Sequence, residues 1–334
     1  MTNLTLTHLR FDAVAQSPVN LQGYLAGNNL RNALANVIRY ATCPETHRRG
    51  APTAEHAATC PACWLLAAEV DPGKVVRAYA VVPPLPARTM VEPGEGFSFG
   101  LTLFGEGFHF LPYFVLAVAE AGRVGVGPGR GNFAVAEIWA AEPLQGWRQQ
   151  VLAAGESLVR VPELAVGWAA VPGLSQGLLD RLNDRDNELA VRFLTPLRLE
   201  EKGRLFKVPD FSVFFRRLLF RIDSLGSQFA GEPGRDRDEV AYLHHLADQV
   251  RLVESETRWH ELWSWSGRKE RKTPLSGLVG MATYWAEDWG PLLPWLVWGQ
   301  ATQVGKSAVK GNGVYELQVL GTPGYWGWLE EATA

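Results

Sequence analysis

Apolar and polar positions follow different periods along the chain, and each period predicts a different element. Residues 4–13 (LTLTHLRFDA) alternate apolar with polar side chains, which is typical of a half-buried strand. In residues 30–40 the apolar side chains of Leu30, Leu34 and Ile38 recur at helical spacing, and Asn28 or Asn29 is expected to cap this helix. Residues 75–82 predict a second strand, because two prolines end the apolar run.

A series of strand, apolar helix, glycine-rich loop and strand occurs twice in the chain. The first copy occupies 97–104, 108–121, 122–132 and 133–139, and the second occupies 278–285, 291–298, 299–313 and 314–319. Glycine is costly inside a helix or strand, so both glycine-rich stretches are predicted to be loops that another backbone approaches closely. The repetition indicates an internal duplication.

The order of elements predicts the fold class. Residues 1 to about 140 show strand–helix–strand–strand–helix–strand, the ferredoxin-like order, in which two split units form one antiparallel sheet. The second half fits the same order, with a strand at 188–194 and an arginine-rich helix at 210–229. We therefore expect an α+β chain of two tandem ferredoxin-like (RRM-like) domains, each with a glycine-rich loop before its last strand. They are expected at 1–145, with a cysteine-containing insertion at 43–63, and at 188–334, with 146–187 as a connecting segment.

Composition bounds the class of protein. The chain has 334 residues, of which 47% are hydrophobic, and a net charge of −3, so it is globular and any nucleic-acid surface must be local. Three cysteines, an odd number, make a secreted disulfide framework unexpected. No run reaches the roughly 18 apolar residues of a membrane span and no signal peptide is recognisable, so we expect a cytoplasmic protein without a membrane partner.

The second glycine-rich loop contains Gly305-Lys306-Ser307, which matches the end of a nucleotide-binding P-loop. The leading glycine of that motif would fall at Gln300, and a P-loop runs from strand to helix whereas this one runs from helix to strand. An ATPase is therefore not the expected function.

Motifs in both halves resemble one known family. Residues 27–34 (GNNLRNAL) precede a cysteine cluster, residues 195–199 read TPLRL, and residues 263–268 read WSWSGR ahead of 277–280 (GLVG). The loop at 299–313 has the pattern G-x5-GK-x4-GxG. The chain is similar in these respects to the CRISPR-associated repeat-processing endoribonucleases of the RAMP superfamily, the Cas6 family. It departs from the family pattern in having three cysteines rather than four, and Asn32 where glycine is usual.

The resemblance implies a function. It implies sequence-specific cleavage of CRISPR repeat RNA (precursor crRNA) without a metal, by attack of a 2′-hydroxyl that leaves a 2′,3′-cyclic phosphate. A catalytically inactive RNA-binding RAMP subunit of a CRISPR effector complex would share the same fold and is the alternative. The implied partners are repeat RNA and other Cas proteins. An unrelated two-domain metabolic enzyme, the third hypothesis, predicts no RNA affinity.

In this family the catalytic histidine tends to lie in or just after the first helix, which makes His47 the first candidate. A histidine that titrates near neutrality can act as base or acid, and Tyr40 and Arg48 are candidates beside it. His56 is the second choice. A surface-loop histidine or a metal ligand remains the structural alternative for His47.

Basic residues near glycines and tryptophans are the candidates for RNA contacts. Lys306 and Lys310 alternate with glycine in the second loop, and Trp263 and Trp265 are placed to stack on unpaired bases. Core packing of the tryptophans and a solvated basic face are the alternatives. The full set of candidate RNA-binding residues is Arg31, Arg216, Arg217, Arg268, Lys269, Lys306 and Lys310.

The cysteines have metal-ligand spacing. Cys43, Cys60 and Cys63 form a C-x16-C-x2-C pattern, which suits a structural zinc site, and a fourth ligand is needed from His47 or His56. If His47 binds zinc it cannot also serve as a free base. Free buried thiols are the alternative, and no cofactor is expected for catalysis itself.

Overall fold

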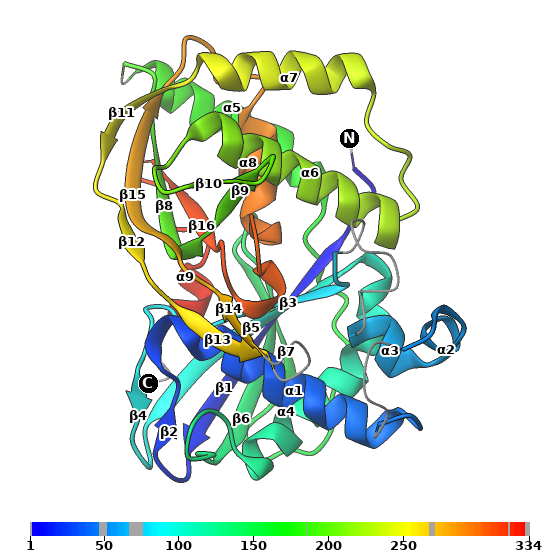
Figure 1. Ribbon diagram of the computed structural model, residues 1–334. Coiled ribbons are helices and arrows are strands. Elements are labelled where there is room, and N and C mark those ends of the chain that lie inside the picture. Colours follow the sequence, from blue (N-terminus) through cyan, green and yellow to red (C-terminus); the bar gives the residue numbers. More distant parts are fainter. Residues whose placement is uncertain are drawn as a thin grey trace.

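The computed structural model describes residues 2–46, 52–66, 76–184, 186–266, 271–319 and 321–330. Two antiparallel sheets form the centres of the two halves of the chain (Figure 1). None of the helices in these ranges combines the length and apolar character that crossing a bilayer requires.

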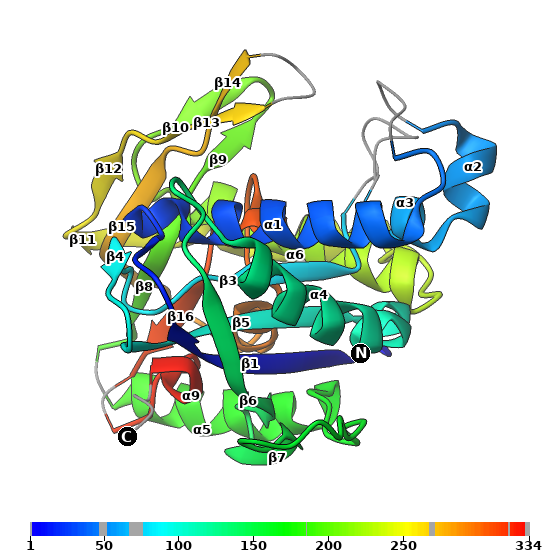
Figure 2. The ribbon, with the colours of Figure 1, turned by 90° about the horizontal axis from the view of Figure 1, so that it is seen from below.

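The N-terminal sheet has the strand order β3-β5-β1-β6-β7, and every neighbouring pair is antiparallel. Helices α1 (Ala26–Thr42) and α4 (Leu111–Val124) pack together on one face of this sheet (Figure 2). The strands are β1 (Leu6–Ala15), β3 (Tyr79–Val82), β5 (Gly96–Phe104), β6 (Phe133–Glu142) and β7 (Trp147–Leu152).

The C-terminal sheet has the order β11-β15-β8-β16, which repeats the connectivity of the first. Helix α6 (Phe211–Phe229) follows β8, and α8 (Leu293–Gly299) precedes β16, as α1 and α4 do in the first domain. The strands are β8 (Glu188–Leu197), β11 (Arg251–Ser255), β12 (Arg258–His260), β15 (Gly277–Trp285) and β16 (Tyr315–Gln318). The tandem ferredoxin-like prediction is confirmed, and a glycine-rich loop precedes β6 and β16.

Several shorter helices and strands lie outside the two main sheets and their helices. Two small helices, α2 (Ala54–Thr59) and α3 (Pro61–Leu66), lie in the insertion, and a hairpin of β13 (Trp263–Ser266) and β14 (Arg271–Pro274) extends from the second domain. The other elements are β2 (Val19–Asn20), β4 (Met90–Val91), α5 (Val171–Asn183), β9 (Leu199–Glu201), β10 (Arg204–Phe206), α7 (Arg237–Gln249) and α9 (Gly327–Glu330).

Strand β1 differs from its sequence-based prediction, because it is buried on both faces rather than one. The apolar side chains pack toward the helices, where the ring of Phe11 stacks on that of Phe99 at 5.3 Å. The polar side chains face the end of the chain: His8 Nε2 lies 2.8 Å from the Tyr325 hydroxyl, and Arg10 donates to the carbonyl of Trp328 at 2.5 Å. The alternating pattern was correct, but the polar face is covered by another segment instead of water.

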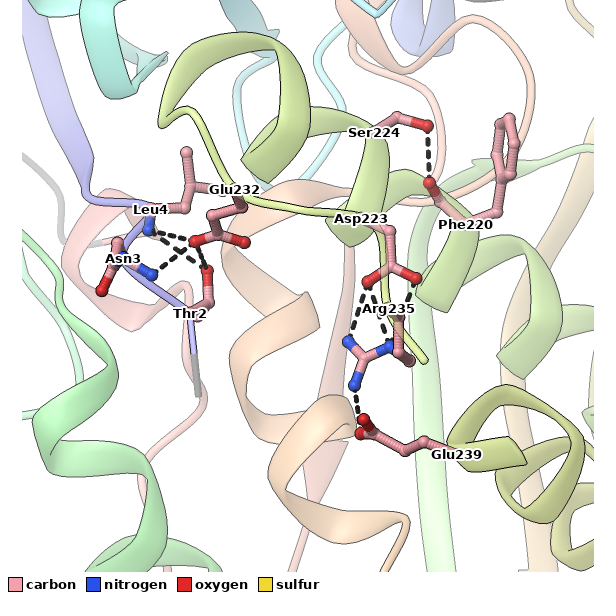
Figure 3. Close-up of polar contacts among 9 residues, drawn as sticks. All are labelled: Thr2, Asn3, Leu4, Phe220, Asp223, Ser224, Glu232, Arg235 and Glu239. Carbon is pink, nitrogen blue, oxygen red and sulfur yellow. Dashed lines mark hydrogen bonds and ion pairs between the residues drawn. The ribbon is translucent and has the colours of Figure 1, made fainter. Parts of the chain in front are cut away.

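The first residues of the chain are fixed by the second domain (Figure 3). The Glu232 carboxylate accepts hydrogen bonds from the Thr2 hydroxyl at 2.5 Å and from the Leu4 amide at 2.8 Å. Nearby, Arg235 bridges Asp223 and Glu239, with N–O distances of 2.8 and 2.5 Å. The Glu232 contacts join the two domains at the start of the chain, whereas the ion pairs of Arg235 lie within the second domain.

Two local predictions need correction. Helix α1 begins at Ala26, so Asn28 lies inside it and its side chain donates to the Ser264 hydroxyl at 3.1 Å instead of capping the helix. The segment 146–187, expected to be mainly a connection, contains β7 and α5. Pro172 stands in the first turn of α5, where a missing amide costs little, and glycines at 173 and 177 conceal its amphipathic pattern.

Candidate functional site

Helix α1 connects three features that the sequence singled out. Its first turn contacts the second glycine-rich loop and the β13–β14 hairpin, and its last residues lead into the cysteine insertion (Figures 1 and 2). Hairpin and insertion lie near opposite ends of the helix. The residues along α1 and around these contacts therefore form the candidate site.

The second glycine-rich loop, residues 299–313, packs between the two domains. The side-chain amide of Gln303 donates to the Val81 carbonyl of β3 at 2.9 Å, and Gln303 is 1% exposed. At Gly27 of α1 an added Cβ would lie 2.3 Å from the carbonyl oxygen of Lys310. Since no side chain fits there, the glycines allow the two backbones to touch, as the sequence predicted.

The two lysines of this loop occupy different environments. The Lys306 side chain is 61% exposed, and its Nζ lies 3.8 Å from a Glu200 carboxylate oxygen. Lys310 is half-buried and has interactions of its own. Lys306 is thus the lysine of the loop that faces water, and a phosphate contact by either residue stays a prediction.

Arg31 and Arg77 form the most unusual electrostatic feature near α1; we call them the arginine pair. Arg31 lies one turn after Gly27, and Arg77 precedes β3. Among the described residues, Arg31 Nε and Arg77 Nη1 are buried without a hydrogen-bond partner, as is the hydroxyl of Tyr79. Burial, with the neighbouring charge of Arg31, lowers the pKa of Arg77 to about 10, so it still carries its charge at neutral pH.

Buried charged donors without acceptors are costly, and such groups usually have a partner. Guanidinium N–H groups are well suited to the oxygens of a phosphate. The arginine pair is therefore a candidate anion site beside the loop that joins the domains. Arg31 was among the candidates predicted from the sequence, whereas Arg77, two residues before β3, was not.

Tyr40 lies on the opposite flank of α1. Nine residues separate it from Arg31, which at 100° per residue is a rotation of about 180°. Its side chain is 68% exposed and lines a pocket of about 700 Å³ between α1, α4 and the first glycine-rich loop. Asn29, Asn32 and Asn36 also line that pocket. The structure therefore does not bring Tyr40 together with the arginine pair.

The two predicted arginines of α6 differ from each other. Arg216 forms ion pairs with Glu201, at 3.5 Å, and with Asp248, its Nε is buried without a hydrogen-bond partner among the described residues, and its phosphate contact stays a prediction. Arg217 is half-buried, and its Nε has no hydrogen-bond partner in the part of the chain that the structure describes. One turn further on, Arg221 donates to the Thr302 carbonyl at 2.5 Å, which places this face of α6 beside the start of the second glycine-rich loop.

The β13–β14 hairpin exposes two aromatic rings. Trp263 is 53% and Trp265 is 64% exposed, so neither belongs to the core. Arg268 and Lys269, between the two strands of the hairpin, lie outside the described residues, as do His47 and Arg48. Those four predictions stay predictions.

The insertion brings together four side chains from Cys43 to Cys63; we call them the cysteine–histidine cluster. Its ligand atoms all lie within 4.8 Å of one another. Burial, with hydrogen bonds from the two neighbouring thiols, raises the pKa of the Cys63 thiol to about 12, the reverse of the shift that marks a nucleophilic cysteine. The members are Cys43, His56, Cys60 and Cys63.

Two family models match parts of the chain. Residues 191–315 match the model of the CRISPR-associated endoribonuclease Cas6. Residues 4–164 match AF_1859_N, which describes an N-terminal domain. No curated protein matches the chain in sequence.

Solved structures match nearly the whole chain. Cas6 of Thermus thermophilus (TTHB231) is 14% identical with a TM-score of 0.53, and the match covers 95% of this chain and 100% of that one. The product complex of the same protein gives 16% identity and a TM-score of 0.55, covering 94% and 100%. A chain of a partial Cas6-RT-Cas1–Cas2 complex gives 13% identity and a TM-score of 0.60, covering 96% of this chain and 47% of that one. At these identities the likeness shows a shared fold.

Proposed function

We propose that the chain is a Cas6-family protein that cuts CRISPR repeat RNA, because the Cas6 endoribonuclease model matches residues 191–315 and the fold of a Cas6 structure matches 94% of its length. The family match is the observation that carries the proposal. The arginine pair gives it a location, because Arg31 Nε and Arg77 Nη1 lack partners among the described residues and guanidinium donors suit the oxygens of a phosphate.

The proposed reaction needs no metal. The 2′-oxygen of the nucleotide before the cut bonds to the adjacent phosphorus, and the bond from phosphorus to the 5′-oxygen breaks. The 2′-hydroxyl proton goes to a base, and the leaving 5′-oxygen receives a proton. The products are a 2′,3′-cyclic phosphate and a 5′-hydroxyl. The enzyme must hold the three atoms in line, move the protons and stabilise charge on the phosphorane.

The roles we assign follow from residue chemistry. Arg31 and Arg77 would donate to the non-bridging oxygens of the phosphate, where charge develops in the transition state. His47 would take or give the proton, since an imidazole can do either near neutral pH. The exposed rings of Trp263 and Trp265 would stack on unpaired bases that flank the cut. The likeness to a chain of a Cas6-RT-Cas1–Cas2 complex supports other Cas proteins as partners beside the repeat RNA.

End-labelled repeat RNA tests the proposal in a buffer without added metal that contains a chelator. A cut at one position, absent from an RNA of the same composition with scrambled repeat sequence, supports the endoribonuclease. Tight retention of the repeat without cutting supports instead the catalytically inactive RNA-binding subunit. Absence of both binding and cutting contradicts both hypotheses.

His47→Ala tests the proposed base. Cleavage should be abolished while affinity for the repeat changes by no more than a few-fold, because the imidazole acts on a proton rather than on binding. His245→Ala replaces an exposed histidine on α7 and serves as the matched control. Unchanged cleavage by the His47 variant would remove that residue from the mechanism.

A further inference from the structure

The cysteine–histidine cluster joins three separate pieces of backbone. Cys43 is the residue that ends α1, His56 lies in α2, and Cys63 lies in α3, with Cys60 at the junction of the two short helices. The three cysteines are 6–8% exposed, and all are free thiols. A group of soft, buried ligands from three elements is typical of a structural metal site.

Two distances from Cys43 Sγ match those of a zinc tetrahedron, and all four ligand atoms lie within 4.8 Å of one another. With Zn–S and Zn–N bonds near 2.3 and 2.05 Å, tetrahedral geometry places two sulfurs about 3.8 Å apart and sulfur about 3.6 Å from nitrogen. In the structure Cys43 Sγ lies 3.7 Å from Cys63 Sγ and 3.5 Å from His56 Nε2. A disulfide would need a sulfur separation near 2.05 Å, so these thiols are arranged around a centre and not bonded in pairs.

The imidazole of His56 is oriented as a metal ligand. Its Nε2 points at the sulfur of Cys43, while its Nδ1 faces a carboxylate oxygen of Glu45 at 3.7 Å. A metal-bound histidine usually has a carboxylate beside its other ring nitrogen, which fixes the tautomer and raises the basicity of the ligating nitrogen. The backbone amide of His56 also donates to the Thr53 hydroxyl, which caps α2.

We propose that the cysteine–histidine cluster binds one structural Zn²⁺. Three thiolates and one imidazole fill all four positions of zinc, so no position is left for a reacting water. Since His56 completes the set, His47 is not needed as a ligand, and the conflict between the metal site and the base disappears. The proposal does not depend on the nuclease activity.

The metal would fasten the insertion to the body of the protein. Helices α2 and α3 have six residues each, too short to be stable alone. The ring of Trp64 in α3 stacks on Phe110 at 5.0 Å and meets Phe229 of α6 edge-on at 5.8 Å. Zinc therefore ties α1 to a short helix that touches both domains.

Metal analysis of the purified full-length chain tests the proposal. We expect about one zinc per chain after expression in zinc-supplemented medium, and cobalt exchanged into the site should give the visible bands of a tetrahedral ion with a thiolate charge-transfer band. Stripping the metal should lower Tm by at least about 5 °C, and Zn²⁺ alone should restore it. Less than about a tenth of an equivalent of zinc, with no change of Tm on chelation or zinc addition, would overturn the proposal.

Two variants identify the ligand set without relying on nuclease activity. His56→Ala should change the cobalt d–d bands and weaken zinc binding, whereas His245→Ala should do neither. Glu45→Gln should weaken zinc binding about 10–100-fold while leaving the ligands in place, and Glu55→Gln, an exposed acid of α2, is its matched control. If His56→Ala retains the wild-type spectrum and zinc content, the assignment of the fourth ligand is wrong.

Discussion

Replacing Arg77 by methionine should stabilise the free protein while it impairs RNA binding and cleavage. The Arg77 Nη1 is buried without a partner among the described residues, and burial lowers the pKa of this side chain. An unpaired buried donor costs about 1–3 kcal/mol. Because part of the side chain reaches water, we take the lower end, about 1 kcal/mol, which in a chain of this size raises Tm by about 2 °C.

The effect on RNA has the opposite sign. Loss of one phosphate contact should reduce the slope of log affinity against log salt by about 0.7 for a single strand. If the same donor stabilises the phosphorane, the single-turnover cleavage rate should fall about 10²–10³-fold. Binding is measured at several salt concentrations with a repeat that carries a 2′-deoxynucleotide before the cut, so that cleavage does not interfere.

Arg88→Met is the matched control, because Arg88 has partners. Its guanidinium donates to the Gly96 carbonyl at 2.8 Å and to Glu95 at 2.9 Å, so its loss should lower Tm and leave RNA binding unchanged. If Arg77→Met behaves like this control in stability, salt slope and cleavage, the arginine pair is a structural feature and the phosphate-site reasoning is wrong.

Three further predictions concern other parts of the structure. Gly27→Ala should lower the free energy of unfolding by about 2–4 kcal/mol in urea titration, because its Cβ would lie 2.3 Å from a backbone oxygen. Replacing Trp263 and Trp265 by alanine should change stability by less than about 0.5 kcal/mol, yet weaken binding of the repeat by about 1–3 kcal/mol per stacked base. Burial lowers the pKa of His8 to about 3, so neutral His8 contributes its full stabilisation above pH 6.5. Between pH 6.5 and 3 the free energy of unfolding should fall by about 1.4 kcal/mol per pH unit.

Each of these three predictions has a control variant or a result that would contradict it. Gly177→Ala, in a helix with open space around the glycine, should be stabilising by about 0.5–1 kcal/mol, and equal effects at the two glycines would contradict the close-contact argument. Unaltered RNA affinity in the double tryptophan variant would place the RNA elsewhere. In His8→Asn the decrease in the free energy of unfolding between pH 6.5 and 3 should be smaller than in the wild type. An unchanged decrease would show that other groups cause it.

Local pattern was sufficient to predict the duplicated fold, because both domains place the glycine-rich loop between an apolar helix and a buried strand. It was insufficient where the environment of a residue is set by segments distant in the sequence. Asn28 looks like a cap in sequence, but it lies inside α1, where its side chain donates to Ser264. The polar face of β1 is buried because the last residues of the chain cover it.

The candidate site shows the same limit. Spacing among the cysteines predicted a metal site with His47 or His56 as the fourth ligand, and within the described residues the structure brings His56 beside the three thiols. Arg31 was predicted from its place in a helix, whereas the interest of Arg77 lies in a buried donor without a partner among the described residues, which no sequence pattern indicates. The sequence also did not show that Arg216 pairs with two acidic residues from other elements, Glu201 and Asp248.

The chemistry of the RNA ends tests the central claim most directly. Repeat RNA is incubated with the purified chain, and the products are analysed by mass spectrometry, alongside a repeat with one 2′-deoxynucleotide before the cut. We predict a single cut with a 2′,3′-cyclic phosphate and a 5′-hydroxyl, and no cut in the deoxy-substituted RNA. Products with a 3′-hydroxyl and 5′-phosphate, or equal cleavage of the deoxy-substituted RNA, would contradict attack by the 2′-hydroxyl.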